Sequence, residues 1–206
     1  MGGYAPFSPI DEIMEKFKYF ISGIYPPYIW MHIIAYFFSS KKHIIKEDIE
    51  QWKRHTGMKE MSLIHKLSYL LVFEKPFRNL FYRRIGSAGK FINVLIPGEK
   101  TLFLTPHEIG GGFFIRHGYA TFVNTFKVGK NCIIHQCTTI GDSGKGIPTI
   151  GNNVEIGTGA IILGPITIGD NVTIAAGAIV VDDIPANSVV IGNKATIVKP
   201  KIEKIK

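Results

Sequence analysis

Histidine side chains are the groups in this 206-residue chain best suited to acid–base chemistry. An imidazole has an unperturbed pKa near neutral, so it can take up or release a proton at the pH of the cell. Three of the seven histidines lie in the second half of the chain, namely His107, His117 and His135. Three converging histidines would also suit zinc. However, His117 follows Ile115 by two residues, whereas His135 follows Ile134 by one. The two therefore occupy different positions of the repeat described next, and we expect no metal site.

A six-residue repeat sets the elements that position these histidines. Aliphatic residues recur every six positions in two runs: Val128, Ile134 and Ile140, then Ile150, Ile156, Ile162, Ile168, Ile174 and Val180. A helix face repeats every three to four residues and a strand alternates every two, so neither explains the interval. Short strands joined by tight bends explain it, because stacked coils of such units pair as parallel strands around an aliphatic interior. Glycine and asparagine in "GNN" and "GDN" suit the bends, and the interval disfavours a sandwich of alternating strands.

The first part of the chain is expected to be helical. Apolar periodicity, caps and breakers predict five helices. Their expected ranges are 10–21, a segment after Pro27, 43–55, 61–73 and 77–86. From Gly86 to Thr105 we expect mixed loop and short strand. The chain is therefore divided into a helical region over residues 1–86, a repeat domain over 87–198 and a basic tail over 199–206.

Composition excludes several classes of protein. A hydrophobic content of 46% is too high for a disordered chain. The net charge of +8 is not gathered into a basic stripe interleaved with aromatic residues, so we expect no nucleic-acid partner. Cys132 and Cys137 lack the spacing of a zinc site. With no signal peptide visible, we expect reduced thiols in a cytoplasmic protein.

An uncharged apolar segment from Tyr19 to Phe38 is just long enough to span a bilayer. Pro26 and Pro27 interrupt it, and the piece after them is too short to cross alone. We therefore expect two buried helices instead of a membrane span. Contact with a membrane surface stays open, which would place a cytoplasmic protein at the inner face of the membrane.

The repeat region also carries the stretch "HGYATFVNTFKVGKNCIIHQCTTIGDSGKGIPTIGNNVEIGTGAIILGPITIGDNV". This stretch resembles the hexapeptide-repeat acyltransferases, most of all the serine acetyltransferase branch, and the resemblance covers about residues 100–198. The segments "EKPFRNLFYRRIG" and "IGGGFFIRHGYAT" are similar to relatives from polysaccharide gene clusters. The resemblance implies an α+β chain in which an N-terminal helical region precedes a left-handed parallel β-helix with three repeats per turn.

The resemblance also assigns chemistry to particular positions. Such enzymes move an acetyl group from a thioester to a hydroxyl, which needs a base for the hydroxyl proton. His117 stands at the position of the family's catalytic histidine. Acetyl-CoA, the cosubstrate, lies in a groove between adjacent subunits of a homotrimer, and trimers can pair through their helical regions. The implied cofactor-binding residues are Gly141, Asp142, Thr158 and Ala176 in the groove and Lys199 near the nucleotide phosphates.

Three positions depart from the serine acetyltransferase pattern. Leu102 stands where the family has an aspartate that orients the catalytic histidine and helps to hold serine. Arg116 replaces the acidic residue before that histidine, and Ile147 replaces a second histidine that contacts serine. A pocket that pairs with a charged amino acid cannot lose both partners cheaply, so we expect a sugar hydroxyl as acceptor. Glu108 is the nearest acid in sequence that could orient His117, and a backbone carbonyl would serve equally well.

An insertion interrupts the repeat between Ile140 and Ile150, where the interval is ten residues instead of six. Loops extruded from a coil of this kind often carry recognition. Lys145 in this loop, together with Arg116, is a candidate for binding an anionic acceptor, and Lys145 also for a cofactor phosphate. The alternative for the loop is a mobile segment that only shields the site.

These observations predict an acetyl-CoA-dependent O-acetyltransferase that acts on a sugar hydroxyl in surface-polysaccharide or glycolipid-precursor synthesis. Transfer is expected to be direct, with His117 as the base and no acyl-enzyme. Two alternatives remain. One is a serine O-acetyltransferase of cysteine biosynthesis, and the other is a non-catalytic β-helix scaffold that docks through its helical region.

Overall fold

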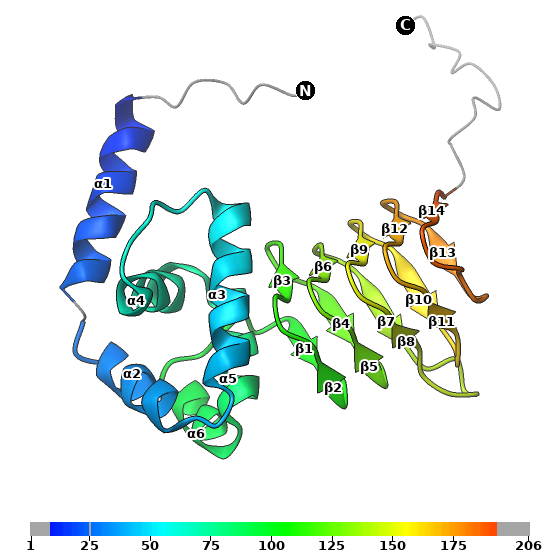
Figure 1. Ribbon diagram of the computed structural model, residues 1–206, viewed down its shortest axis with the longest axis horizontal. Coiled ribbons are helices and arrows are strands. Elements are labelled where there is room, and N and C mark those ends of the chain that lie inside the picture. Colours follow the sequence, from blue (N-terminus) through cyan, green and yellow to red (C-terminus); the bar gives the residue numbers. More distant parts are fainter. Residues whose placement is uncertain (1–8, 25, 193–206) are drawn as a thin grey trace, which may run out of the picture.

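The computed structural model describes residues 9–24 and 26–192. Helices form one end of the molecule and a coil of short strands the other (Figure 1). The helices are α1 (Pro9–Gly23), α2 (Ile29–Phe38), α3 (Lys42–Thr56), α4 (Leu63–Phe73), α5 (Lys75–Ile85) and α6 (Ser87–Leu95). Helices α3 and α5 both contact strand β3 (Phe114–Ile115), so they join the helical end to the coil.

Local signals in the sequence explain where several helices begin and end. Gly57 ends α3 in the left-handed region, with a φ of 68°. Ser62 caps α4, because its Oγ accepts a hydrogen bond from the backbone N–H of His65 at 3.3 Å. Pro76 lies in the first turn of α5, where a missing N–H leaves no helical bond unmade. The first five helices match the sequence prediction.

The structure differs from the sequence prediction over residues 87–95. Mixed loop and short strand is the prediction there, but Ser87–Leu95 forms α6. Glycine disfavours helix intrinsically, and this segment contains Gly89. The same glycine lets α6 pack closely on α5, because a Cβ there would lie 2.1 Å from the carbonyl oxygen of Tyr82. Packing therefore overrides propensity in this segment.

The repeat region forms a parallel β-helix with three faces (Figure 1). Sheet A contains β1 (Leu102–Leu104), β4 (Thr121–Val123), β7 (Thr139–Gly141), β10 (Ile161–Leu163) and β13 (Ile179–Val180). Sheet B contains β2 (Glu108–Ile109), β5 (Lys127–Val128), β8 (Thr149–Ile150) and β11 (Thr167–Ile168). Sheet C contains β3, β6 (Ile133–Ile134), β9 (Glu155–Ile156), β12 (Thr173–Ile174) and β14 (Val189–Val190). The chain thus visits the three sheets in turn, consistent with the expected left-handed β-helix.

The six-residue aliphatic series lines the interior of this coil. Each of its nine members is 3% exposed or less. In sheet A, Ile162 pairs in register with Ile140 on one side and Val180 on the other. Burying one such side chain contributes about 1.5–3 kcal/mol, so the ladders are the main source of stability in the coil. The prediction drawn from the repeat is confirmed.

A second ladder, of asparagines, runs along the turns between sheets B and C. Its members have φ values of 54–61° and are Asn131, Asn153, Asn171 and Asn187. Each of the first three donates a side-chain N–H to the side-chain oxygen of the next, at 3.3, 3.0 and 2.9 Å in order along the coil. Asparagine tolerates this left-handed conformation better than most residues, which explains the "GNN" and "GDN" bends.

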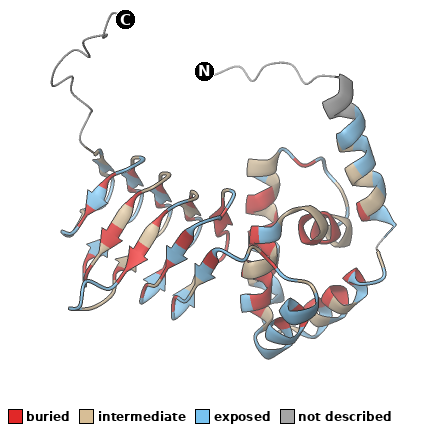
Figure 2. Cartoon of the chain, turned by 180° about the vertical axis from the view of Figure 1, so that it is seen from behind, coloured by how far each residue is buried: buried red, intermediate tan, exposed pale blue. Residues whose placement is uncertain are grey.

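The apolar segment near the N-terminus forms the end of α1 and all of α2, which are two separate helices as predicted. In the described residues, no helix is both long and apolar enough to cross a membrane. The expectation that both helices are buried is only partly correct, because one face of each stays open (Figure 2). Exposed apolar side chains on them include Phe17, Phe20, Trp30, Ile34 and Phe38.

Candidate active site

His117 lies in a turn that is longer than its counterparts in the coil. Ile115 pairs with Ile134, and Phe122 pairs with Thr139. The interval between the two paired residues is therefore seven in the first coil and five in the next. The two extra residues are absorbed at this turn. The N–H of Gly118 donates to the carbonyl of Arg116 at 2.7 Å.

The resulting three-residue turn has His117 at its centre with a φ of 62°. This is the strained form of the γ-turn, and a non-glycine residue held in such a conformation costs about 1–3 kcal/mol. Strain of this kind concentrates at functional sites. The turn leaves the His117 side chain exposed.

Helices α3 and α5 hold the segment that leads into this turn. Arg84 and Asp48 form a buried ion pair with two hydrogen bonds, of 2.9 and 3.1 Å. Arg84 also donates to the carbonyls of Ile109 and Gly110, and Asp48 accepts from the N–H of Phe113 at 3.1 Å. These contacts tie the first coil to the helical region, and they position β3 just before His117.

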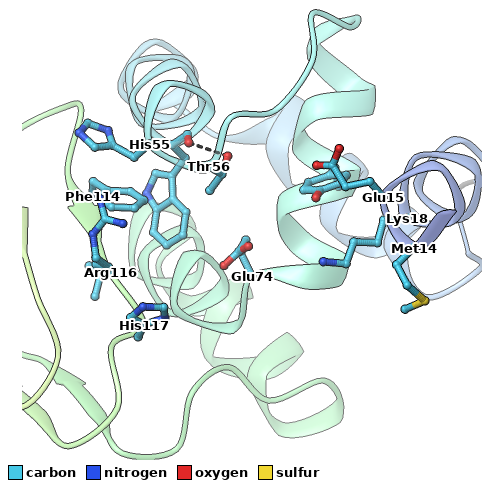
Figure 3. Close-up of a pocket in the computed structure, with 12 residues that line it drawn as sticks. Met14, Glu15, Lys18, His55, Thr56, Glu74, Phe114, Arg116 and His117 are labelled. Carbon is cyan, nitrogen blue, oxygen red and sulfur yellow. Dashed lines mark hydrogen bonds between the residues drawn. The ribbon is translucent and has the colours of Figure 1, made fainter. Parts of the chain in front are cut away.

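A cavity of about 370 Å³ opens between the helices and the turn (Figure 3). Helix α1 contributes Met14, Glu15 and Lys18, α3 contributes Trp52, His55 and Thr56, and α4 contributes Tyr69. The remaining lining residues are Glu74, between α4 and α5, and Phe114, Ile115, Arg116 and His117 of the coil. Of the predicted site residues, the sequence neighbours Arg116 and His117 both line this cavity.

Charged groups of both signs face this cavity. Burial raises the pKa of the Glu74 carboxyl above its usual value, and the nearby Lys18 opposes that rise. The Arg116 guanidinium lies 5.5 Å from the centre of the Phe114 ring, and its Nε is shielded from solvent without a hydrogen-bond acceptor in the described residues. A small polar molecule bound in the cavity could donate a hydrogen bond to the Glu74 carboxylate.

The four predicted groove residues lie at two different corners of the coil. Gly141 and Asp142 come at the end of β7, where the chain passes from sheet A to sheet B. Thr158 and Ala176 follow β9 and β12, where it passes from sheet C to sheet A. Within a single subunit, the two pairs of residues therefore lie at opposite ends of the sheet A strands. Lys199 lies outside the described residues.

Asp142 and Lys145 belong to the inserted loop between β7 and β8. The Asp142 carboxylate accepts hydrogen bonds from the N–H groups of Gly144 and Gly146 at 2.7 and 2.9 Å, and these amides lower its pKa. It therefore shapes the loop. Lys145 is exposed and does not line the cavity that contains His117.

The positions that depart from the serine acetyltransferase pattern have distinct surroundings. Leu102 is 4% exposed and its side chain contributes to the apolar core. Ile147 is half-buried in the inserted loop. Glu108 is exposed on β2, in sheet B, and is not among the residues that line the cavity with His117.

The other two C-terminal histidines lie elsewhere. His107 precedes β2 and packs against Phe126, with ring centres 5.6 Å apart. His135 follows β6 and pairs with Glu155 at 3.3 Å. Within residues 9–24 and 26–192, no group of three or more His, Cys, Asp or Glu residues could hold a metal ion.

Comparison with known proteins identifies the family. Residues 147–182 match the model described as bacterial transferase hexapeptide (six repeats). The serine acetyltransferase of Helicobacter pylori is 41% identical over 145 residues, which are 66% of this chain and 80% of that protein. The chain belongs to the hexapeptide-repeat transferase family.

Other relatives of this hexapeptide-repeat transferase are matched over less of their length. The serine acetyltransferase of Synechocystis is 44% identical over 151 residues, which are 69% of this chain and 56% of that protein. The putative colanic acid biosynthesis acetyltransferase of Escherichia coli is 46% identical over 93 residues, 43% of this chain and 57% of that protein. The chain thus spans little more than half the length of these two relatives.

Solved structures agree on the fold of this hexapeptide-repeat transferase. The soybean serine acetyltransferase apoenzyme superposes with a TM-score of 0.61 at 24% identity, over 76% of this chain and 68% of that one. An identity this low supports a shared fold alone.

Sequence reasoning missed the residues that the helical region of this hexapeptide-repeat transferase adds to the cavity. Lys18, His55 and Glu74 lie on three separate segments, and only packing brings them beside His117. One signal was present in the sequence. Glu74 stands immediately before "KP", where a new helix begins, so an acid at this helix junction was a candidate for a special role.

Proposed function

We propose that this chain transfers the acetyl group of acetyl-CoA to a hydroxyl of a small polar acceptor, with His117 as the general base. The observation that carries the proposal is the placement of His117 on a strained turn beside the cavity between coil and helices. Acetyl-CoA supplies the thioester. Membership of the hexapeptide-repeat transferase family supports this chemistry.

Each group in the reaction has a defined task. The His117 imidazole removes the proton of the acceptor hydroxyl as the hydroxyl oxygen attacks the acetyl carbonyl carbon. The new carbon–oxygen bond forms, the carbon–sulfur bond breaks, and the proton passes from His117 to the departing sulfur. The products are the acetyl ester and free CoA, with no acyl-enzyme.

L-Serine is the first acceptor to test. The relatives named serine acetyltransferase include the one of which this chain covers 80%, so the comparisons favour serine over a sugar. A sugar hydroxyl remains the second candidate, because Leu102 is core-packed and Ile147 is apolar where the family pattern has serine-binding groups. The match to the putative colanic acid biosynthesis acetyltransferase supports this second candidate.

We further propose a homotrimer whose subunits meet through sheet A. The outward side chains of this sheet form a mostly apolar column that includes Phe103, Phe122, Ile161 and Ile179. The outward face of sheet B is instead polar, with Glu108, Lys127, Thr149 and Thr167. Contact through sheet A would allow the two corners of neighbouring subunits to form one acetyl-CoA groove.

The substitution His117→Asn tests the proposal. It retains a polar side chain without the basicity, so turnover should fall by about 10²–10⁴-fold while calorimetry shows nearly unchanged acetyl-CoA binding. His135→Asn is the matched control, because His135 lies at the following turn and outside the cavity. Free thiol is measured with acetyl-CoA and either L-serine or a panel of nucleotide sugars and methyl glycosides. Turnover by His117→Asn above about a third of wild type would refute the role of His117.

A further inference from the structure

Glu74 is the single residue between helices α4 and α5, and its backbone is held by both. Its N–H donates to the carbonyl of Leu70 at 2.9 Å, and its carbonyl accepts from the N–H of Arg78 at 3.2 Å. The main chain therefore leaves the Glu74 side chain little choice of direction.

The neighbouring Pro76 brings this junction against the His117 turn. A Cβ placed on Gly118 would lie 3.0 Å from the Pro76 side chain, so the Gly118 backbone and Pro76 are in close contact. Glu74 precedes Pro76 by two residues, and His117 precedes Gly118 by one. Both side chains line the same cavity, in which Figure 3 draws the Glu74 carboxylate between Lys18 and His117.

The carboxylate makes none of the bonds that a structural role would need. Glu74 is the N-cap residue of α5, yet its side chain makes no capping hydrogen bond. Over residues 9–24 and 26–192, no hydrogen bond or ion pair to its carboxylate oxygens is formed, and Lys18 acts on it only as a nearby charge. A half-buried carboxylate without donors is costly, and such costs are kept mainly at functional sites.

We propose that Glu74 is the acceptor-binding carboxylate of this site. It accepts a hydrogen bond from a donor group that stands beside the reacting hydroxyl of the acceptor. That group is an ammonium in a hydroxy-amino acid or a second hydroxyl in a sugar. An ionised carboxylate is suited to both, because it only accepts hydrogen bonds and binds donors more strongly than a neutral oxygen does.

This inference rests on the proposed function and extends it, because the helical region then takes part in selecting the acceptor. Arg116 lies on the coil side of the same cavity and would pair with a carboxylate or phosphate of the acceptor. A bound acceptor would supply the Glu74 carboxylate with the hydrogen-bond donor that it otherwise lacks among the described residues.

Two substitutions test the inference, Glu74→Leu and Glu74→Gln. Leucine has similar size and no acceptor atom, so the KM for the acceptor should rise by about 10–100-fold while the KM for acetyl-CoA stays near wild type. Glutamine separates the two kinds of donor. With L-serine as acceptor, the loss of charge should raise the KM of Glu74→Gln as much as that of Glu74→Leu. With a methyl glycoside, the carbonyl oxygen that glutamine retains should limit the increase in KM to a few-fold.

Glu108→Gln is the matched control, since this carboxylate is exposed on sheet B and lies outside the cavity. Thermal unfolding of all variants excludes misfolding. A binding role leaves the Glu74 variants at least as stable as wild type, whereas a structural role predicts a loss of stability.

Acceptor binding measured by calorimetry separates this inference from the proposed function. Glu74-dependent acceptor binding without acetyl transfer by wild type would contradict the proposed function and support the role of Glu74. Acetyl transfer with an acceptor KM for Glu74→Leu within twofold of the Glu108→Gln control would overturn the role of Glu74.

Discussion

Replacing Arg84 by methionine should destabilise the protein more than any exposed charge substitution. The Arg84 and Asp48 side chains are 5% and 2% exposed, and Arg84 also donates to two carbonyls of the first coil. Methionine preserves the length of the side chain but leaves the Asp48 carboxylate buried without its cation. Breaking a buried pair in this way costs about 3–5 kcal/mol. Solvent screening does not reduce this cost, because both groups are almost fully enclosed.

That cost is large beside the total stability of about 5–15 kcal/mol that is typical of folded proteins. With a urea dependence of about 2–3 kcal/mol per molar, the unfolding midpoint should fall by roughly 1–2.5 M. The freed carbonyls of Ile109 and Gly110 lie just before β3. The His117 turn should therefore lose its alignment, and turnover should fall in the fraction of the variant that remains folded.

Urea unfolding at one fixed protein concentration measures the effect, because the stability of an oligomer depends on concentration. Lys53→Met is the control, since Lys53 pairs with Glu60 at an exposed site and such pairs contribute about 0–1 kcal/mol. Adding Asp48→Leu to the Arg84 variant removes the stranded charge and should restore much of the stability. A loss below about 1 kcal/mol for Arg84→Met alone, at the level of an exposed pair, would refute the reasoning.

Three further predictions follow from the described contacts. Burial raises the pKa of Glu74 above 4.5, so its ionisation opposes folding, and wild type loses stability as pH rises through the raised pKa. Glu74→Gln should therefore melt higher than wild type at neutral pH, and this gain should vanish below pH 4.5; an equal gain at both pH values would contradict the burial argument. Asn171→Ala should cost about 1–2 kcal/mol in thermal unfolding, because alanine disfavours its φ of 57°, whereas Asn171→Gly should cost less; equal losses would exclude backbone conformation as the cause. Phe122→Lys should dissociate the proposed trimer, as measured by light scattering, whereas Thr149→Lys on sheet B should not; a wild type that is monomeric at micromolar concentration would contradict the assembly proposal.

The parts of the fold that depend on local pattern could be predicted from sequence. The interval from Ile150 to Val180 was sufficient for the β-helix, because a fixed period with inward aliphatic residues has few other solutions. Five helices followed from apolar periodicity and breakers such as Gly57 and Pro27. Helix α6 did not, since Gly89 lowers propensity and only packing on α5 reveals why a glycine is needed there.

The site was less accessible to such reasoning. His117 could be selected because a resemblance fixed its position, and it lines a cavity together with its sequence neighbour Arg116. Lys18 and His55 could not be selected, because their proximity to His117 depends on how separate segments pack together. Glu74 carried one local signal, an acid directly before a helix start, but its place beside His117 also depends on packing. The turn conformation of His117 could not be predicted either, because histidine, unlike glycine or asparagine, gives no indication of a positive φ.

The turn that contains His117 also shows that the length of a turn can change in this fold without changing the strand pairing on either side. Its two extra residues change neither neighbouring pair, because Ile115 still meets Ile134 and Phe122 still meets Thr139. A corner of the coil can therefore accommodate extra residues. A one-residue insertion within a strand would instead turn every later side chain of that strand to the opposite face. A designer could graft turns of other lengths and chemistries at this corner, or at the β7–β8 insertion, and keep the same interior. Under the proposal that Glu74 binds the acceptor, a change of acceptor would require changes only in exposed turns and at the α4–α5 junction, without repacking the coil.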